Sequence, residues 1–135
     1  MWLQLKEIGE FGLIKRIARD VIYGPGVVEG IGDDACVLDF GGDFRLLVTI
    51  DMLVEGSHFL RDKIFPYQLG RKALAVNLSD IAAMGGLPRY FLVSIGVPSS
   101  LPVEYIDEIY RGMRDLASKW EVSLVGGDTV RSEVT

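Results

Sequence analysis

The segment 74–86 constrains the fold most, because its pattern is that of a mostly buried helix carrying two polar side chains. Apolar residues recur there at spacings of three and four, and the pair Gly85-Gly86 follows where a helix would end. Asn77 and Asp80 lie three residues apart, so a helix places both on one face. Such groups are costly to bury unless they are paired, hydrogen-bonded or bound to metal. They predict either a cap on a neighbouring loop or part of a metal site.

Three further acidic sites, like Asp80, lie beside apolar segments of the sequence. They are Asp33-Asp34, Asp51 and Asp128, and each follows a predicted strand or lies in a glycine-flanked loop. Four carboxylate sites beside apolar segments predict a cluster of hard oxygen ligands, the kind that Mg²⁺ requires. The alternative is a scatter of acidic loop residues with no common role.

The composition predicts a soluble, cytoplasmic protein of one domain, covering residues 1–135. A chain of this length that is 49% hydrophobic can build a core and also leave an apolar interface. The net charge of −5 argues against a nucleic-acid partner. No apolar run approaches the roughly 20 residues of a membrane span, and the first residues lack a signal-peptide pattern. The single cysteine, Cys36, allows no internal disulfide and is most simply a core residue.

Hydrophobic periodicity predicts three helices and at least four strands. The helices are expected at 9–22, 67–84 and 102–120, and the strands at 35–38, 44–50, 90–97 and 122–125, with a further, weakly alternating strand at 129–135. The expected apolar stripe of the first helix holds Phe11, Ile14, Ile17, Ala18 and Val21, and that of the third holds Val103, Ile106, Tyr110, Met113, Ala117 and Trp120. A turn at 41–43 joins the first two strands. This order predicts an α/β (α+β) two-layer sandwich, with a mixed β-sheet and helices on one face.

The two longest predicted strands, 44–50 and 90–97, are apolar almost without alternation. Strands of this kind are covered on both faces, whereas one layer of helices covers only one face of the sheet. The pattern therefore predicts a homodimer that forms through the sheet.

The usual phosphate-binding fingerprints are absent, so the carboxylate set is the main functional signal. Neither the Walker pattern nor the dinucleotide spacing occurs, and no Ser-His-Asp order stands out. Phosphoryl transfer requires phosphates held in line and neutralised by Mg²⁺, which clustered carboxylates would provide. Gly126-Gly127 would let the backbone approach a phosphate closely. His58 lies in the loop 52–65, and a solitary loop histidine, taken alone, is more often a surface residue than a functional one.

Four motifs resemble those of the thiamine-monophosphate kinase family, in the superfamily of aminoimidazole ribonucleotide synthetase. They are Gly-Ile-Gly-Asp-Asp-Ala at 30–35, Asp-Met-Leu-Val-Glu-Gly-Ser-His-Phe at 51–59, Lys-Ala-Leu-Ala-Val-Asn-Leu-Ser-Asp-Ile-Ala-Ala-Met-Gly at 72–85 and Val-Gly-Gly-Asp-Thr-x-Arg at 125–131. The motifs occur in the family's order, and the resemblance covers nearly all of residues 9–132.

The resemblance implies ATP-dependent phosphorylation of thiamine monophosphate to thiamine diphosphate by direct in-line transfer, without a catalytic side chain of its own. By position, the implied Mg²⁺ ligands are Asp34, Thr49, Ile50, Asp51, Asp80 and Asp128. Ile50 departs from the Thr or Ser usual there, which leaves only its backbone carbonyl.

The resemblance also implies the substrate contacts. His58 would contact thiamine phosphate, whereas Gly127 and Asp128 would form the nucleotide-phosphate loop. Tyr110, in a Tyr-x-Gly sequence, would contact ATP, although its place in an apolar stripe equally suits a core residue. The related domains pair their sheets into a barrel shared by two subunits. The resemblance therefore implies the same arrangement for the homodimer that the apolar strands predict.

The family enzyme is about twice as long, so the chain is expected to be its N-terminal ATP- and Mg²⁺-binding half, inactive alone. The alternatives are another ATP-using member of the superfamily, making selenophosphate or an aminoimidazole ribonucleotide, and a non-catalytic domain that binds metal-nucleotide or dimerises. The motif that contains His58 favours the thiamine enzyme, and no reactive cysteine precedes Tyr23.

Overall fold

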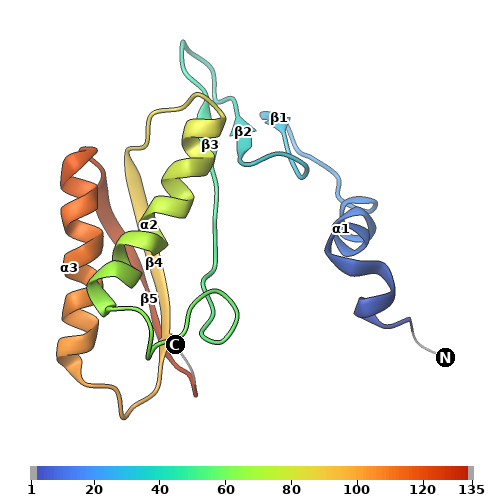
Figure 1. Ribbon diagram of the computed structural model, residues 1–135. Helices are drawn as coiled ribbons and strands as arrows, with labels where there is room; N and C mark the ends of the chain where they lie inside the picture. Colours follow the sequence, from blue (N-terminus) through green and yellow to red (C-terminus); the bar gives the residue numbers. More distant parts are fainter. Residues whose placement is uncertain (1–2, 134–135) are drawn as a thin grey trace. The chain divides into compact units, whose positions relative to one another are not determined.

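A computed structural model describes residues 3–133 of the chain, which divides into two compact units. The N-terminal unit is Met1–Val48 and the C-terminal unit is Thr49–Thr135. Figure 1 follows the chain through both, from blue to red.

The N-terminal unit holds a helix and a small antiparallel sheet. Helix α1 (Leu5–Ala18) precedes strands β1 (Val27–Glu29), β2 (Cys36–Leu38) and β3 (Leu46–Val48), which pair in the order β1-β2-β3. The predicted turn at 41–43 joins β2 to β3, and Gly41 and Gly42 adopt the positive φ angles that such a turn requires. β1 was not predicted, and β3 is shorter than the expected 44–50.

Helix α1 begins and ends four residues earlier than its apolar pattern predicts. It bends at Gly9, where φ is 64°, and it buries none of its residues. Phe11 and Ile17 in the predicted apolar stripe are 77% and 55% exposed. The helical period was therefore right, but the stripe has no partner surface within this unit.

Helix α2 (Pro66–Ala83) has the start and end that the sequence indicates. Pro66 occupies the first turn, where its missing N–H costs nothing. At the other end, the amide of Gly86 donates to the carbonyl of Ile81 at 2.9 Å, and Gly85 has a φ of 69°. These are the features of a glycine-terminated helix.

Helix α3 (Val103–Lys119) packs against α2 through two glycines. A Cβ on Gly70 would overlap the carbonyl oxygen of Ile109, and one on Gly112 would overlap that of Tyr67. The backbones approach this closely only because both positions lack a side chain. The buried face of α3 therefore runs through Ile109, Gly112, Met113, Leu116 and Ala117.

The α3 stripe expected from the sequence was partly wrong. Val103 and Trp120 were assigned to it, yet they are 70% and 56% exposed. The face of α3 that contacts α2 is centred on Gly112, a position that hydrophobic periodicity cannot predict to be buried.

Strands β4 (Tyr90–Val97) and β5 (Ser123–Arg131) pair in parallel, with α3 connecting them. β4 has the predicted bounds, whereas β5 continues through Gly126-Gly127-Asp128, where a loop was expected. Gly127 fits there because a Cβ would overlap the carbonyl oxygen of Val93 on β4. The further strand expected at 129–135 is thus partly the end of β5, and residues 134–135 lie outside the described range.

Both helices of the C-terminal unit cover one face of the β4–β5 sheet (Figure 1). Phe91 and Val93 point to that face and pack against the core residues of α2 and α3, including Leu69, Ile109 and Met113. Tyr90 and Leu92 lie on the opposite face and are 73% and 70% exposed. Apart from its last residues, β4 therefore alternates in burial, and the described residues of this unit leave its second face uncovered.

The expected mixture of helices and strands is confirmed. The strands do not form one mixed sheet, because an antiparallel sheet lies in one unit and a parallel pair in the other. Within residues 3–133 no sheet closes into a barrel. None of the helices described is both long and apolar enough to cross a membrane.

Candidate functional site

The segment after β3 is held on α2 by Asn77 and Asp80, the two polar residues that interrupt the apolar pattern of this helix. The hydroxyl of Thr49 donates to Asp80 Oδ2 at 2.8 Å, in partly buried surroundings. Two hard oxygen atoms from separate segments thus lie next to each other. Asp80 therefore projects toward the Thr49–Asp51 segment.

Asn77 caps the same segment, as one of the two original interpretations proposed. Its Oδ1 accepts a hydrogen bond from the amide of Asp51 at 3.0 Å, and its Nδ2 donates to the carbonyl of Ala73 at 3.0 Å. Both Asp51 and Ile50 are exposed, and the Ile50 side chain is 87% exposed. Asn77 and Asp80 therefore do share a helix face, and they fix the backbone around two implied metal ligands.

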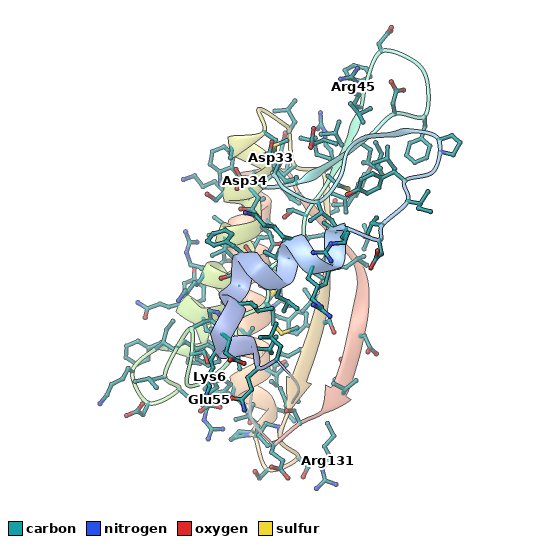
Figure 2. All side chains as sticks on the ribbon, turned by 90° about the vertical axis from the view of Figure 1, so that its right-hand side faces the viewer. Lys6, Asp33, Asp34, Arg45, Glu55 and Arg131 are labelled. Atoms are coloured by element: carbon teal, nitrogen blue, oxygen red, sulfur yellow. The ribbon has the colours of Figure 1, made fainter. Side chains whose placement is uncertain are left out.

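Asp34 belongs to the N-terminal unit, where it follows Asp33 on the loop before β2 (Figure 2). The carboxylate of Asp33 accepts a hydrogen bond from the Asp34 amide at 2.9 Å. The hydroxyl of Tyr23 accepts one from the Ile31 amide at 2.7 Å. The ring of Tyr23 lies over Gly30, where any Cβ would overlap it. Tyr23 thus holds this loop, a role that no motif in the sequence indicates.

The implied metal ligands are divided between the two units of the chain. Among residues 3–133, no three His, Cys, Asp or Glu side chains group in a way that could hold a metal ion. Asp34 lies in one unit, whereas Asp51, Asp80 and Asp128 lie in the other. The common metal site stays a prediction.

His58 lies at the end of a tight loop formed by residues 54–59. The amides of Ser57 and His58 both donate to the carbonyl of Val54, at 3.1 and 2.9 Å. The amide of Gly56 donates to the carbonyl of Phe59 at 2.8 Å, and Phe59 is buried in the core beside Leu69, Ile109 and Met113. The loop is therefore anchored by its last residue and closed by its own backbone.

Two contacts from outside the loop fix it further. Arg61 lies 3.3 Å from Glu55, whose side chain is only 19% exposed. The ammonium group of Lys72 on α2 donates a hydrogen bond to the carbonyl of His58 at 2.6 Å. Lys72 is the first residue of the motif at 72–85, yet neither its residue type nor its spacing from His58 indicated this contact.

Tyr105 of α3 packs against the same core, and its hydroxyl is buried with no hydrogen-bond partner within residues 3–133. Burial raises the pKa of Tyr105 above its ordinary value, with Arg61 opposing the shift and Glu55 adding to it.

Tyr110, Gly127 and Asp128, the three residues implied in ATP binding, line one shallow pocket. The pocket has a volume of about 260 Å³ and is also lined by Val93, Leu124, Gly126 and Thr129. Tyr110 reaches it from α3, at a half-buried position beside the helix's core stripe. The structure therefore brings these three residues together, although their binding role stays a prediction.

Comparison with known proteins decides the family. Residues 32–135 match the family described as AIR synthase related protein, N-terminal domain. The chain belongs to this family.

Among curated relatives of this family domain, the chain is similar to thiamine-monophosphate kinases. It is 45% identical over 121 residues to the one from Bacillus subtilis and 40% identical over 131 residues to the one from Aquifex aeolicus. Among solved structures it resembles AaThiL complexed with AMPPCP and TMP, with a TM-score of 0.89 and 38% identity over 99% of the chain. The resemblance inferred from the four motifs is confirmed.

The chain spans only part of these proteins. It covers 37% and 40% of the two curated relatives and 41% of the solved AaThiL chain. The chain therefore matches less than half of the length of each of these proteins.

Proposed function

We propose that the chain is the N-terminal, ATP- and Mg²⁺-binding part of a kinase that phosphorylates thiamine monophosphate to thiamine diphosphate. The observation that carries the proposal is the fold's similarity to a structure holding AMPPCP, an ATP analogue, together with TMP. The kinase names of the curated relatives support the same reaction. We further propose a cytoplasmic location, because the reaction takes ATP from the nucleotide pool of the cell.

The donor chemistry around Thr49 suits Mg²⁺. A hydroxyl and a carboxylate oxygen lie 2.8 Å apart, and the Asp51 backbone is fixed beside them. Asp34, Thr49, Asp51, Asp80 and Asp128 would hold Mg²⁺ with their oxygens, and Ile50 with its carbonyl. Bound Mg²⁺ would neutralise charge on the phosphates during transfer.

The remaining residues position the two substrates. Tyr110 and Gly127 would receive the nucleotide in their common pocket, where glycine allows close approach of a phosphate to the backbone. His58, on its anchored loop, would contact the phosphate of thiamine monophosphate. In-line transfer depends mainly on such positioning, so holding these segments rigid is the chain's main contribution.

We also propose that the protein is a homodimer that pairs its sheets into a shared barrel. The open face of β4, with Tyr90 and Leu92 exposed, supports this arrangement. Covering such a face removes apolar surface from water and protects a strand edge.

The test is a coupled assay of ADP release, with thiamine diphosphate quantified as the product. We expect no detectable turnover by the 135-residue chain and clear turnover by a longer protein that contains it. In that protein, Asp80→Asn should lower the rate by several powers of ten, because each loss of about 1.4 kcal/mol in the transition state is tenfold. Asn can still accept the Thr49 hydrogen bond, so the fold should persist.

The matched control is Asp107→Asn, an exposed carboxylate on α3, which should leave the rate unchanged. Near-normal turnover by Asp80→Asn would remove Asp80 from the metal site. No thiamine diphosphate from the longer protein would favour a domain that only binds metal-nucleotide or dimerises.

A further inference from the structure

The imidazole of His58 is held in one orientation by the loop that carries it. Its Nδ1 accepts a hydrogen bond from the amide of Val54 at 2.9 Å. A ring nitrogen that accepts a hydrogen bond carries no proton, so the neutral ring bears its proton on Nε2. Nε2 has no hydrogen-bond partner within residues 3–133, and the side chain is exposed. The ring therefore presents an N–H donor outward.

The backbone of His58 is held by a cation from another element. The ammonium of Lys72 lies 2.6 Å from the His58 carbonyl, although the two residues are 14 positions apart. No ion pair of Lys72 occurs in the part of the chain that the structure describes. A charged donor on a neutral carbonyl strengthens that hydrogen bond and leaves positive charge beside the histidine.

We propose that Lys72 is a positioning residue that fixes His58, so that His58 binds a phosphate monoester as a neutral Nε2–H donor. This rests on the proposed function, which assigns His58 to the acceptor substrate, and it specifies the tautomer and the residue that maintains it. The positive charge of Lys72 adds an attraction for the phosphate dianion.

Nitrogen NMR tests the positioning directly, because His58 is the only histidine in the chain. At about pH 8, where imidazoles are ordinarily neutral, the ring nitrogens of the ¹⁵N-labelled chain should show an unprotonated Nδ1 and a protonated Nε2. Lys72→Met should move these signals toward the averaged tautomers of free imidazole. A wild-type ring that already averages, or unchanged signals in Lys72→Met, would overturn the proposal.

Two variants show whether an effect belongs to this one contact. Lys63→Met removes the same charge from the loop, but Lys63 faces Asp62 at 3.2 Å, so it should leave the histidine signals unchanged. Lys72→Arg keeps a charged donor and should restore the signals at least in part. Backbone amide spectra that match the wild type would establish that each variant is folded. Equal effects of Lys63→Met and Lys72→Met would mean that the histidine signals respond to any loss of positive charge nearby and not to the Lys72–His58 contact. That result would overturn the positioning role.

Ligand titrations test the phosphate. Inorganic phosphate and thiamine monophosphate should shift the Nε2 signal of the chain, whereas thiamine without phosphate should not. No shift with either phosphate would overturn the proposal. A shift with both, in a protein whose longer form makes no thiamine diphosphate, would retain the phosphate site and reject the kinase.

Kinetics in the active longer protein separate positioning from chemistry. Lys72→Met should raise KM for thiamine monophosphate about tenfold, while kcat and KM for ATP change by less than about twofold, because a ground-state contact is lost. An equal loss in kcat would instead place Lys72 in the transition state and contradict a positioning role.

Discussion

The two units of the chain differ in how much of their apolar surface they bury themselves. Apart from Ala35, every buried hydrophobic residue described lies in the C-terminal unit, mostly on α2 and α3. In the N-terminal unit α1 buries nothing, and three-residue strands carry exposed side chains such as Leu46 and Val48. One unit therefore has its own core, whereas the other buries little apolar surface by itself.

The contrast also separates the functional residues. Asp80, His58 and Lys72 lie on elements that pack around the Leu69–Ile109 core, so their positions are determined within their own unit. The Asp34 amide donates to the Asp33 carboxylate, and Tyr23 holds the same loop through the amide of Ile31. Asp80, His58 and Lys72 are thus held around a core, whereas Asp34 lies on a loop of the unit without one.

The largest expected effect is on stability, and it compares two isoleucines. Ile109→Ala removes a side chain that is 2% exposed and should destabilise the protein by about 2–5 kcal/mol, through lost burial and a cavity. Ile17→Ala in α1, where the side chain is 55% exposed, should cost less than about 0.5 kcal/mol. Urea unfolding followed by circular dichroism measures both. Equal losses would mean that the contrast between the units does not hold in solution.

The next effect concerns association through the open face of β4. Leu92→Asp places a charge on that face and should raise the dimer dissociation constant by on the order of tenfold to a hundredfold, as measured by light scattering. Leu87→Asp, at a residue 76% exposed outside the strands, is the control and should not change it. Val93 is unsuitable, because it packs against the helices and a charge there would disrupt folding.

Two outcomes would change this interpretation. A wild-type chain that stays monomeric at micromolar concentration would exclude the shared barrel. Dissociation by Val48→Asp, with no effect of Leu92→Asp, would move the association to the sheet of the N-terminal unit.

The smallest effect concerns the unpaired hydroxyl of Tyr105. Tyr105→Phe should stabilise the protein by up to about 1 kcal/mol, because it removes a buried polar atom that has no partner among the residues the structure describes. The raised pKa means that the folded state prefers the protonated tyrosine. Its contribution is complete below the ordinary pKa of about 10 and is lost as pH rises through the folded value.

The advantage of Tyr105→Phe over wild type should therefore grow above about pH 10. Thermal unfolding of both proteins between about pH 8 and pH 11 measures this. A constant difference across that range would show that Tyr105 is not shielded from water in solution.

Much of the fold follows from local signals. Pro66 and Gly85-Gly86 fix both ends of α2, and the apolar run 90–97 gives the bounds of β4. Asn77 and Asp80 share a helix face because the spacing of three residues dictates it, so a common contact with a neighbouring segment could be expected, and the structure identifies that segment as Thr49–Asp51. The motif order was also enough to identify the family.

Only the tertiary structure decided which faces are buried and what positions His58. Gly70 and Gly112 set the contact between α2 and α3, and a residue without a side chain gives hydrophobic periodicity no signal there. Lys72 reaches a backbone carbonyl, which any residue in the loop could have offered. The extension of β5 through three polar or glycine residues depends on pairing with β4. Sequence determines local conformation through nearest neighbours, whereas these features arise between segments that only folding brings together.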